Sequence, residues 1–224
     1  NDIIYTEKKE EKKSSDFSYI VVVTGNYLIF KYEILKFITS LNEKSSDFLL
    51  FILIHNASEK EKQNICLSLK NLGISNYKIN FENIDKSNFN EIETRTFYSF
   101  RRFILAKELL DKYKLPIFST DADTVVLKNL KFFIRDNDNV DMSLTIKTNN
   151  RTFKNTISAG YALFLPTEAS YLFLDFCNRL LFHITKHRRL IWFSDQIVLY
   201  SAYIFTKRKL KTKINSNIDN DHNN

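Results

Sequence analysis

Two runs of almost uninterrupted apolar residues limit the folds that this chain can adopt. Ser18–Thr24 reads SYIVVVT and Phe48–Ile54 reads FLLFILI, so apolar and polar residues do not alternate in either run. Such runs are typical of strands that are buried on both faces of a parallel sheet. A segment with apolar residues at helical spacing follows each run, Tyr27–Leu41 after the first and Glu59–Leu72 after the second. These pairs predict an α/β fold.

The same alternation continues along the chain. Tyr77–Phe81 is a weaker third strand, a long helix runs from about Thr94 to Tyr113, and Leu115–Thr120 is a fourth strand. The later elements that the pattern predicts are strands at Met142–Ile146 and Ile157–Leu165, a short helix near Leu130, and helices at Glu168–His183 and Asp195–Phe205. Strands that alternate with helices favour a mainly parallel central sheet flanked by helices.

The length of 224 residues suits one domain with a substantial core. We expect this domain at residues 17–210, after a polar lead-in at 1–16 and before a basic, then Asn-rich tail at 211–224 that we expect to be flexible. No apolar run reaches the roughly 18 residues of a transmembrane helix, and the polar N-terminus does not read as a leader. We therefore expect a cytoplasmic domain, which a longer protein could contain.

The chain is basic, with a formal net charge of +7. Its two basic clusters are Lys207, Arg208, Lys209, Lys211 and Lys213, and Arg179, Lys186, Arg188 and Arg189. Each is compatible with a solvated face, an anion site or peripheral membrane contact. Nucleic acid is not an expected partner, because the clusters are not interleaved with stacking aromatics. Cys66 and Cys177 form no CxxC pair, so neither a disulfide framework nor a zinc site is expected.

The scarcity of glycine excludes the common phosphate-binding loops. Only Gly25, Gly73 and Gly160 are present. A P-loop or a GxGxxG turn needs several clustered glycines so that backbone amides can surround a phosphate. If the chain binds a nucleotide, a metal ion and side chains must neutralise its phosphates instead.

One acidic motif meets that requirement. Phe118–Asp123 reads FSTDAD and places two carboxylates at the carboxyl end of a predicted buried strand, which is where ligands bind in open α/β sheets. Asp121 and Asp123 suit a hard divalent cation whose coordination phosphate oxygens complete. We expect Mn²⁺ or Mg²⁺ here, holding a diphosphate and stabilising its negative charge. The alternative is an acidic turn that caps the following helix.

Several segments together resemble GT-A fold glycosyltransferases of the glycogenin and lipopolysaccharide galactosyltransferase type. Val22–Tyr27 (VVTGNY) is similar to their first strand and nucleotide-binding turn. Phe97–Phe103 (FYSFRRF) and Phe118–Leu130 (FSTDADTVVLKNL) are similar to their Tyr-x-Arg helix and Asp-x-Asp strand. Ser158–Tyr161 (SAGY) resembles their Asn-Ala-Gly or Asn-Ser-Gly segment, and Ser194–Gln196 (SDQ) their Asp-Gln motif. The order and approximate spacing agree over nearly the whole predicted domain.

The resemblance implies a metal-dependent, hexosyltransferase-like enzyme. It would move a sugar from a nucleotide-diphosphate donor, with a UDP-sugar as the first expectation, to a glycan, lipid or protein acceptor. Thr24, Gly25 and Asn26 would contact the base or ribose. Arg101 or Arg102 would pair with the nucleotide or donor sugar, because Arg recognises pairs of oxygens. We favour Arg102, since an apolar residue follows it, as in the family.

The resemblance also gives the diphosphate and sugar ends of the site. Asp121 would touch the ribose and the metal, and Asp123 the metal and both phosphates. Ser158, Ala159 and Gly160 would line the donor-sugar pocket, where glycine lets the backbone approach closely. Ser158 departs from the family, which usually has Asn at that position.

Asp195 would face the anomeric carbon or the acceptor hydroxyl, and Gln196 would hydrogen-bond nearby sugar. Asp195 is open as a base, a nucleophile or a positioning group, and the resemblance leans towards retention of configuration. Its alternative is a helix cap. The family's third metal ligand, often His, and a basic diphosphate ligand have no clear match, because His222 in the tail is the one His after Gln196. The basic run Lys207–Lys213 could still close over the diphosphate.

Two other functions stay open from the sequence. Asp121-Ala122-Asp123-Thr124-Val125 also fits the nucleophile motif of haloacid-dehalogenase-type phosphatases, in which Asp121 would attack phosphorus. That motif normally follows the first strand, whereas here it follows the fourth. The other alternative is a non-catalytic domain that binds a nucleotide sugar.

Overall fold

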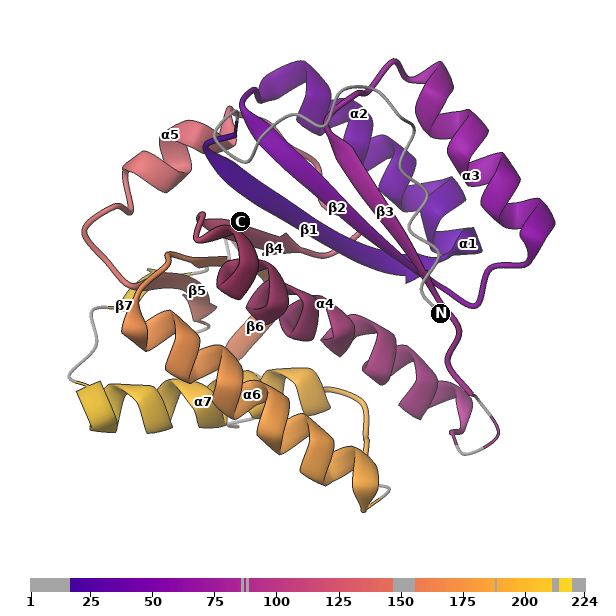
Figure 1. Cartoon of the computed structure of the whole chain (residues 1–224). Coiled ribbons are helices and arrows are strands. Elements are labelled where there is room, and N and C mark those ends of the chain that lie inside the picture. Colours follow the sequence, from indigo (N-terminus) through magenta and orange to yellow (C-terminus); the bar gives the residue numbers. More distant parts are fainter. Residues whose placement is uncertain are drawn as a thin grey trace, which may run out of the picture.

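The computed structural model describes residues 17–85, 87, 89–146, 156–187, 189–210 and 214–218. These residues form one seven-stranded sheet in the order β3-β2-β1-β4-β6-β5-β7 (Figure 1). The strands are β1 Tyr19–Asn26, β2 Phe48–His55, β3 Tyr77–Glu82, β4 Ile117–Thr120, β5 Met142–Ile146, β6 Ile157–Phe164 and β7 Ile214–Ile218. The pairs β1–β2, β1–β4, β2–β3 and β5–β7 are parallel, whereas β6 is antiparallel to β4 and β5. The predicted mainly parallel sheet is confirmed.

The helices are α1 Tyr27–Ile29, the π-helical turn η2 Phe30–Ile34, α2 Leu35–Lys44, α3 Glu59–Asn71, α4 Glu91–Tyr113, α5 Leu130–Arg135, α6 Glu168–Lys186 and α7 Ser194–Leu210. The first predicted helix is therefore interrupted by a π-helical turn. Helix α4 begins three residues earlier than predicted, because the Asn90 and Glu93 side chains form a capping box there. None of the helices in the described part of the chain is long and apolar enough to cross a bilayer.

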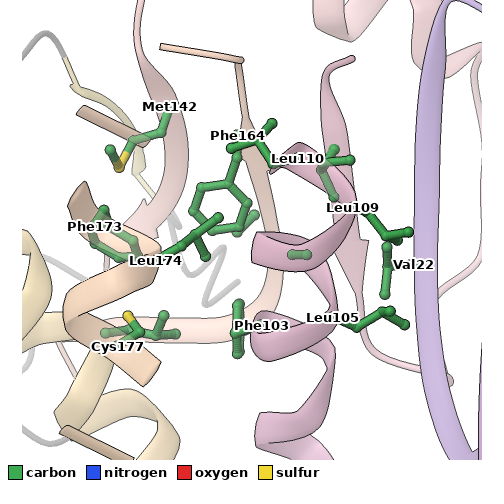
Figure 2. Packing of buried hydrophobic residues seen from close by; sticks show 14 of the residues in the cluster. Val22, Phe103, Leu105, Leu109, Leu110, Met142, Phe164, Phe173, Leu174 and Cys177 are labelled. Carbon is green, nitrogen blue, oxygen red and sulfur yellow. The ribbon is translucent and has the colours of Figure 1, made fainter. Parts of the chain in front are cut away.

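Two apolar layers enclose the sheet, one on each face. Alternate residues of β1 and β2 point into different layers, as strand geometry requires. Tyr19, Val21 and Val23 pack in the layer with α2 and α3, and Ile20 and Val22 in the layer with α4, α6 and α7. Figure 2 shows the second layer, where Val22 lies against Leu105 and Leu109 of α4. The sheet is thus buried on both faces, as the uninterrupted apolar runs predicted.

Part of the tail assigned to residues 211–224, Ile214–Ile218, has a place in the sheet. This segment forms β7 and pairs in parallel with β5, from Met142 beside Ile214 to Ile146 beside Ile218. The free backbone groups at the edge of β5 offer hydrogen-bond partners to any extended segment, whatever its side chains. An Asn-rich composition therefore did not exclude a strand. Residues 211–213, 219–224 and the lead-in 1–16 lie outside the described residues.

Candidate functional site

A cavity of about 720 Å³ lies where β1 and β4 end and β6 begins. Because β6 runs antiparallel to β4, its first residues lie beside the last residues of β4, and the Asp121 amide donates to the Gly160 carbonyl at 2.7 Å. The predicted site residues that line the cavity are Thr24, Gly25, Asn26, Arg102, Asp121, Asp123, Ser158, Ala159, Gly160, Asp195 and Gln196. The fold therefore brings together segments that lie far apart in the sequence.

Arg102 fixes the first acid of the Asp-x-Asp motif. Its guanidinium donates to Asp121 Oδ1 and to the carbonyl oxygen of Ala159, while its side chain is almost fully buried. Its Nε is buried with no hydrogen-bond partner among the described residues. Burial raises the pKa of Asp121 above its usual range, Arg102 opposes that shift, and Asp123 and Asp195 add to it.

The second acid is presented differently. Asp123 is exposed at the cavity and forms no ion pair within the described ranges. No group of three His, Cys, Asp or Glu side chains placed to hold a metal occurs among the described residues. Mg²⁺ is commonly bound by one or two protein carboxylates, and phosphate and water oxygens complete its octahedral coordination. Asp121 and Asp123 fit that mode, and a Cβ on Gly160 would lie 3.8 Å from Asp121 Oδ2, so glycine leaves the space beside the acid open.

Asp195 lies at the start of α7 on another side of the cavity. Its carboxylate is largely buried and accepts two hydrogen bonds, from Ser99 Oγ at 2.9 Å and from the Gln196 amide at 2.8 Å. An N-terminal cap would instead accept from amides two or three residues further along the helix. The arrangement is therefore that of a buried acid held by a neighbouring helix.

The turn before Asp195 was not predicted from the sequence. The Ser194 amide donates to the Ile191 carbonyl at 3.0 Å, and the Ile191 amide donates to Ser194 Oγ at 2.9 Å. Phe193 has φ 70° at the third position of this turn, where type II turns normally carry glycine. Trp192 is 52% exposed beside it, and both residues line the cavity. A bulky residue in this conformation is a genuine outlier, and such strain concentrates at functional sites.

Arg101 points away from the cavity. Its guanidinium makes two hydrogen bonds to Glu82, at 2.9 and 2.7 Å, and Glu82 also lies 3.2 Å from Nδ1 of the buried His55. The ring of His55 stacks on that of Tyr98, with centroids 4.4 Å apart. Of the two arginines proposed from the sequence, the structure thus brings Arg102 to the site and gives Arg101 a partner at the ends of β2 and β3.

The β1 end of the cavity has its own internal contacts. Thr24 Oγ1 donates to the Tyr98 carbonyl at 3.2 Å, and Asn26 Oδ1 accepts from the Ile29 amide at 2.9 Å, which caps α1. A Cβ on Gly25 would lie 2.8 Å from Ile29 Cγ2. Glycine is therefore required there for the close packing of α1 on β1, whether or not a ligand also approaches it.

Comparisons with known proteins identify the fold. No protein-family model matches the sequence, and no curated protein does either. The glycosyltransferase GlyE of Streptococcus pneumoniae TIGR4 is 15% identical, with a TM-score of 0.53 over 90% of this chain and 45% of that one. The galactosyltransferase LgtC, in complex with donor and acceptor sugar analogues, is 14% identical, with a TM-score of 0.58 over 80% of this chain and 69% of that one. For mouse xyloside xylosyltransferase 1 the identity is 10% and the TM-score 0.53, over 90% and 85% of the two chains.

This chain therefore spans less than half the length of GlyE and about two thirds of that of LgtC. Each of these comparisons covers 80% or more of this chain. The chain has the GT-A fold of these glycosyltransferases, as its sequence predicted.

Proposed function

We propose that this chain transfers a sugar from a nucleoside-diphosphate donor to a hydroxyl group of an acceptor, with Asp121 and Asp123 holding Mn²⁺ or Mg²⁺. The observation that supports this most strongly is the single cavity that gathers Asp121, Asp123, Arg102 and Asp195 at the carboxyl edge of the sheet. The exposed Asp123, beside the ion pair of Arg102 with Asp121, suits a ligand that carries both a metal-bound diphosphate and a polar sugar.

Each side chain would have a distinct task. Thr24 and Asn26, which line the cavity at the end of β1, would contact the base or ribose. Arg102 would orient Asp121 and favour its ionised form, against the effect of burial on the pKa of that acid. A bound metal ion would neutralise the charge that develops on the leaving diphosphate. Asp195, which is largely buried and faces the same cavity, would act on the anomeric carbon or on the acceptor hydroxyl.

The acceptor is proposed to lie against the turn formed by Ile191–Ser194. Sugar rings present a face of C–H groups, and aromatic side chains with one wet side suit such partly apolar ligands. Trp192 and Phe193 offer this surface directly beside Asp195 and Gln196. Glycine would suit the backbone conformation of Phe193 better, so the aromatic side chain at this position is consistent with a contact to a ligand.

Phe193→Gly tests this acceptor surface. Glycine removes about 1–2 kcal/mol of left-handed strain, which offsets the lost aromatic packing, so the melting temperature should stay near that of the wild type. The KM for a glycoside acceptor should rise several-fold, whereas hydrolysis of the donor by water should be unchanged. Lys114→Gly is the matched control, because Lys114 has φ 55° at the end of α4, away from the cavity. Acceptor kinetics that respond equally to both changes would contradict the assignment.

The proposed function itself is tested by turnover. The wild-type chain is incubated with a panel of nucleotide sugars and Mn²⁺, and release of the free nucleoside diphosphate is measured with and without simple glycosides. We expect release from at least one donor and its loss on chelation of the metal. A chain that binds nucleotide sugar but releases nothing would favour the non-catalytic alternative.

The phosphatase alternative receives no support from the structural neighbours, which are described as glycosyltransferases. In the sheet, Asp121 follows β4, whereas the phosphatase nucleophile follows the first strand of its fold. Release of inorganic phosphate from a simple phosphate ester, lost in Asp121→Asn, would nevertheless overturn the glycosyltransferase proposal. Peripheral membrane contact through the basic clusters stays a prediction.

A further inference from the structure

One ridge of α4 contacts acids on both sides of the cavity. Ser99 and Arg102 lie three residues apart, so they share a face of the helix. Arg102 donates to Asp121, and Ser99 Oγ donates to Asp195 Oδ2 at 2.9 Å. The same helix thus sets the positions of the metal-side acid and of the acid proposed to act at the sugar.

We propose that Ser99 is a positioning residue that holds the Asp195 carboxylate in its working orientation. The inference rests on the proposed glycosyl transfer and assigns Ser99 no contact with substrate. It concerns the orientation of Asp195 relative to the rest of the site, which the sequence motifs do not predict.

The two hydrogen bonds to Asp195 restrain its carboxylate relative to different parts of the molecule. The bond from the Gln196 amide comes from the next residue, so it moves with α7 and cannot orient the acid relative to β4. The bond from Ser99 joins residues 96 positions apart and ties Asp195 to α4. Hydrogen bonds to a carboxylate are stronger than neutral ones, and this one is largely shielded from water, since Asp195 is 9% exposed. Ser99 is therefore the contact that connects Asp195 to the Asp121 side of the cavity.

Helix α4 is a rigid support for such a contact. Phe100 and Phe103, which directly follow Ser99 and Arg102 in the helix, are fully buried in the core. Arg101 clamps the helix to the end of β3 through its two hydrogen bonds to Glu82. A side chain on this helix therefore restricts its partner to a narrow range of positions. Misplacement of a reacting group by about 1 Å can cost a factor of about 100 in rate.

The test compares Ser99→Ala, Ser99→Thr and Tyr171→Phe with the wild-type chain. Tyr171→Phe is the matched control, because it removes another hydroxyl that donates to α4, at the Leu110 carbonyl 3.1 Å away. Melting temperature, UDP affinity in Mn²⁺, and kcat and KM for the best donor are measured for all four proteins. Ser99→Ala should lower kcat by about 10- to 100-fold with UDP affinity and KM near wild type. Ser99→Thr, which keeps the hydroxyl, should recover most of the rate.

Tyr171→Phe should lower the melting temperature as much as Ser99→Ala while kcat stays unchanged. If the wild type turns over and Ser99→Ala keeps kcat within twofold of it, the positioning role is overturned while the proposed function stands. The positioning role is also overturned if Tyr171→Phe lowers kcat as much as Ser99→Ala does, or if Ser99→Thr does not restore kcat. A wild-type chain that releases no nucleoside diphosphate from any donor overturns the proposed function, and the positioning role with it.

Discussion

Asp123→Asn is expected to lower sugar transfer by a factor on the order of 1000 and to remove the dependence of UDP binding on Mn²⁺. Asp123 is exposed at the cavity and forms no ion pair within the described ranges, so its carboxylate is available to a cation. An amide of the same shape is a poorer ligand for a hard ion. Transfer assays, with calorimetry of UDP in the presence and absence of Mn²⁺, measure both effects.

Asp138→Asn is the control, since Asp138 is an exposed acid after α5 that does not line the cavity. It should match the wild type in both measurements. Asp123 is the better probe of the metal than Asp121, because changing Asp121 would also leave the buried Arg102 guanidinium without its counter-charge. Equal UDP affinity with and without Mn²⁺ in the wild type would remove the metal from the proposal.

The central strands could be predicted because burial on both faces leaves a direct pattern in the sequence. Every residue of β2 is buried, and β1 is buried except at Asn26. No comparable pattern encodes strand direction. The apolar pattern of residues 157–165 predicts a strand but not its direction. The antiparallel pairing of β6 with β4 depends on how the chain returns to the sheet. The sequence pattern did not predict β7 either, because this strand depends on backbone pairing with β5.

The cavity could be predicted in outline for a related reason. Motifs that follow parallel strands meet at one edge of the sheet, so Asn26 and Asp121 had to lie near each other. The choice between Arg101 and Arg102 was harder, because successive helix residues point about 100° apart. Which of them faces the cavity depends on the rotation of α4, and that is set by the packing of Phe100 and Phe103.

Contacts between distant segments left no sequence signal. The bond from Ser99 to Asp195 joins two helices that are adjacent in space alone. The turn at Phe193 lacks the glycine that would have indicated a positive φ. Features that break the local rules are expected at functional sites, and these two lie beside the acid proposed to act on the sugar.

Asp195→Asn separates a chemical role of that acid from a structural one. In the structure its oxygens accept from the Gln196 amide and from Ser99 Oγ. An Asn side chain can keep the first bond through its oxygen, and the Ser99 hydroxyl can rotate to accept from its NH₂ group. Stability and UDP affinity should therefore stay near those of the wild type. Transfer should fall by a factor on the order of 100 or more, the scale associated with loss of a general acid or base.

Asp195→Ala extends the comparison. It should lose as much activity as Asp195→Asn and also about 1–3 kcal/mol of stability, because the Ser99 hydroxyl and the Gln196 amide lose their acceptor. Thermal melts beside transfer assays on the three proteins resolve the two contributions. Two variants that are equally inactive but differ in melting temperature would mean that the charge drives transfer while the hydrogen bonds support the fold. Near-native transfer by Asp195→Asn would instead make Asp195 a structural residue, and the group that acts on the acceptor hydroxyl would then have to be sought among the other side chains of the cavity.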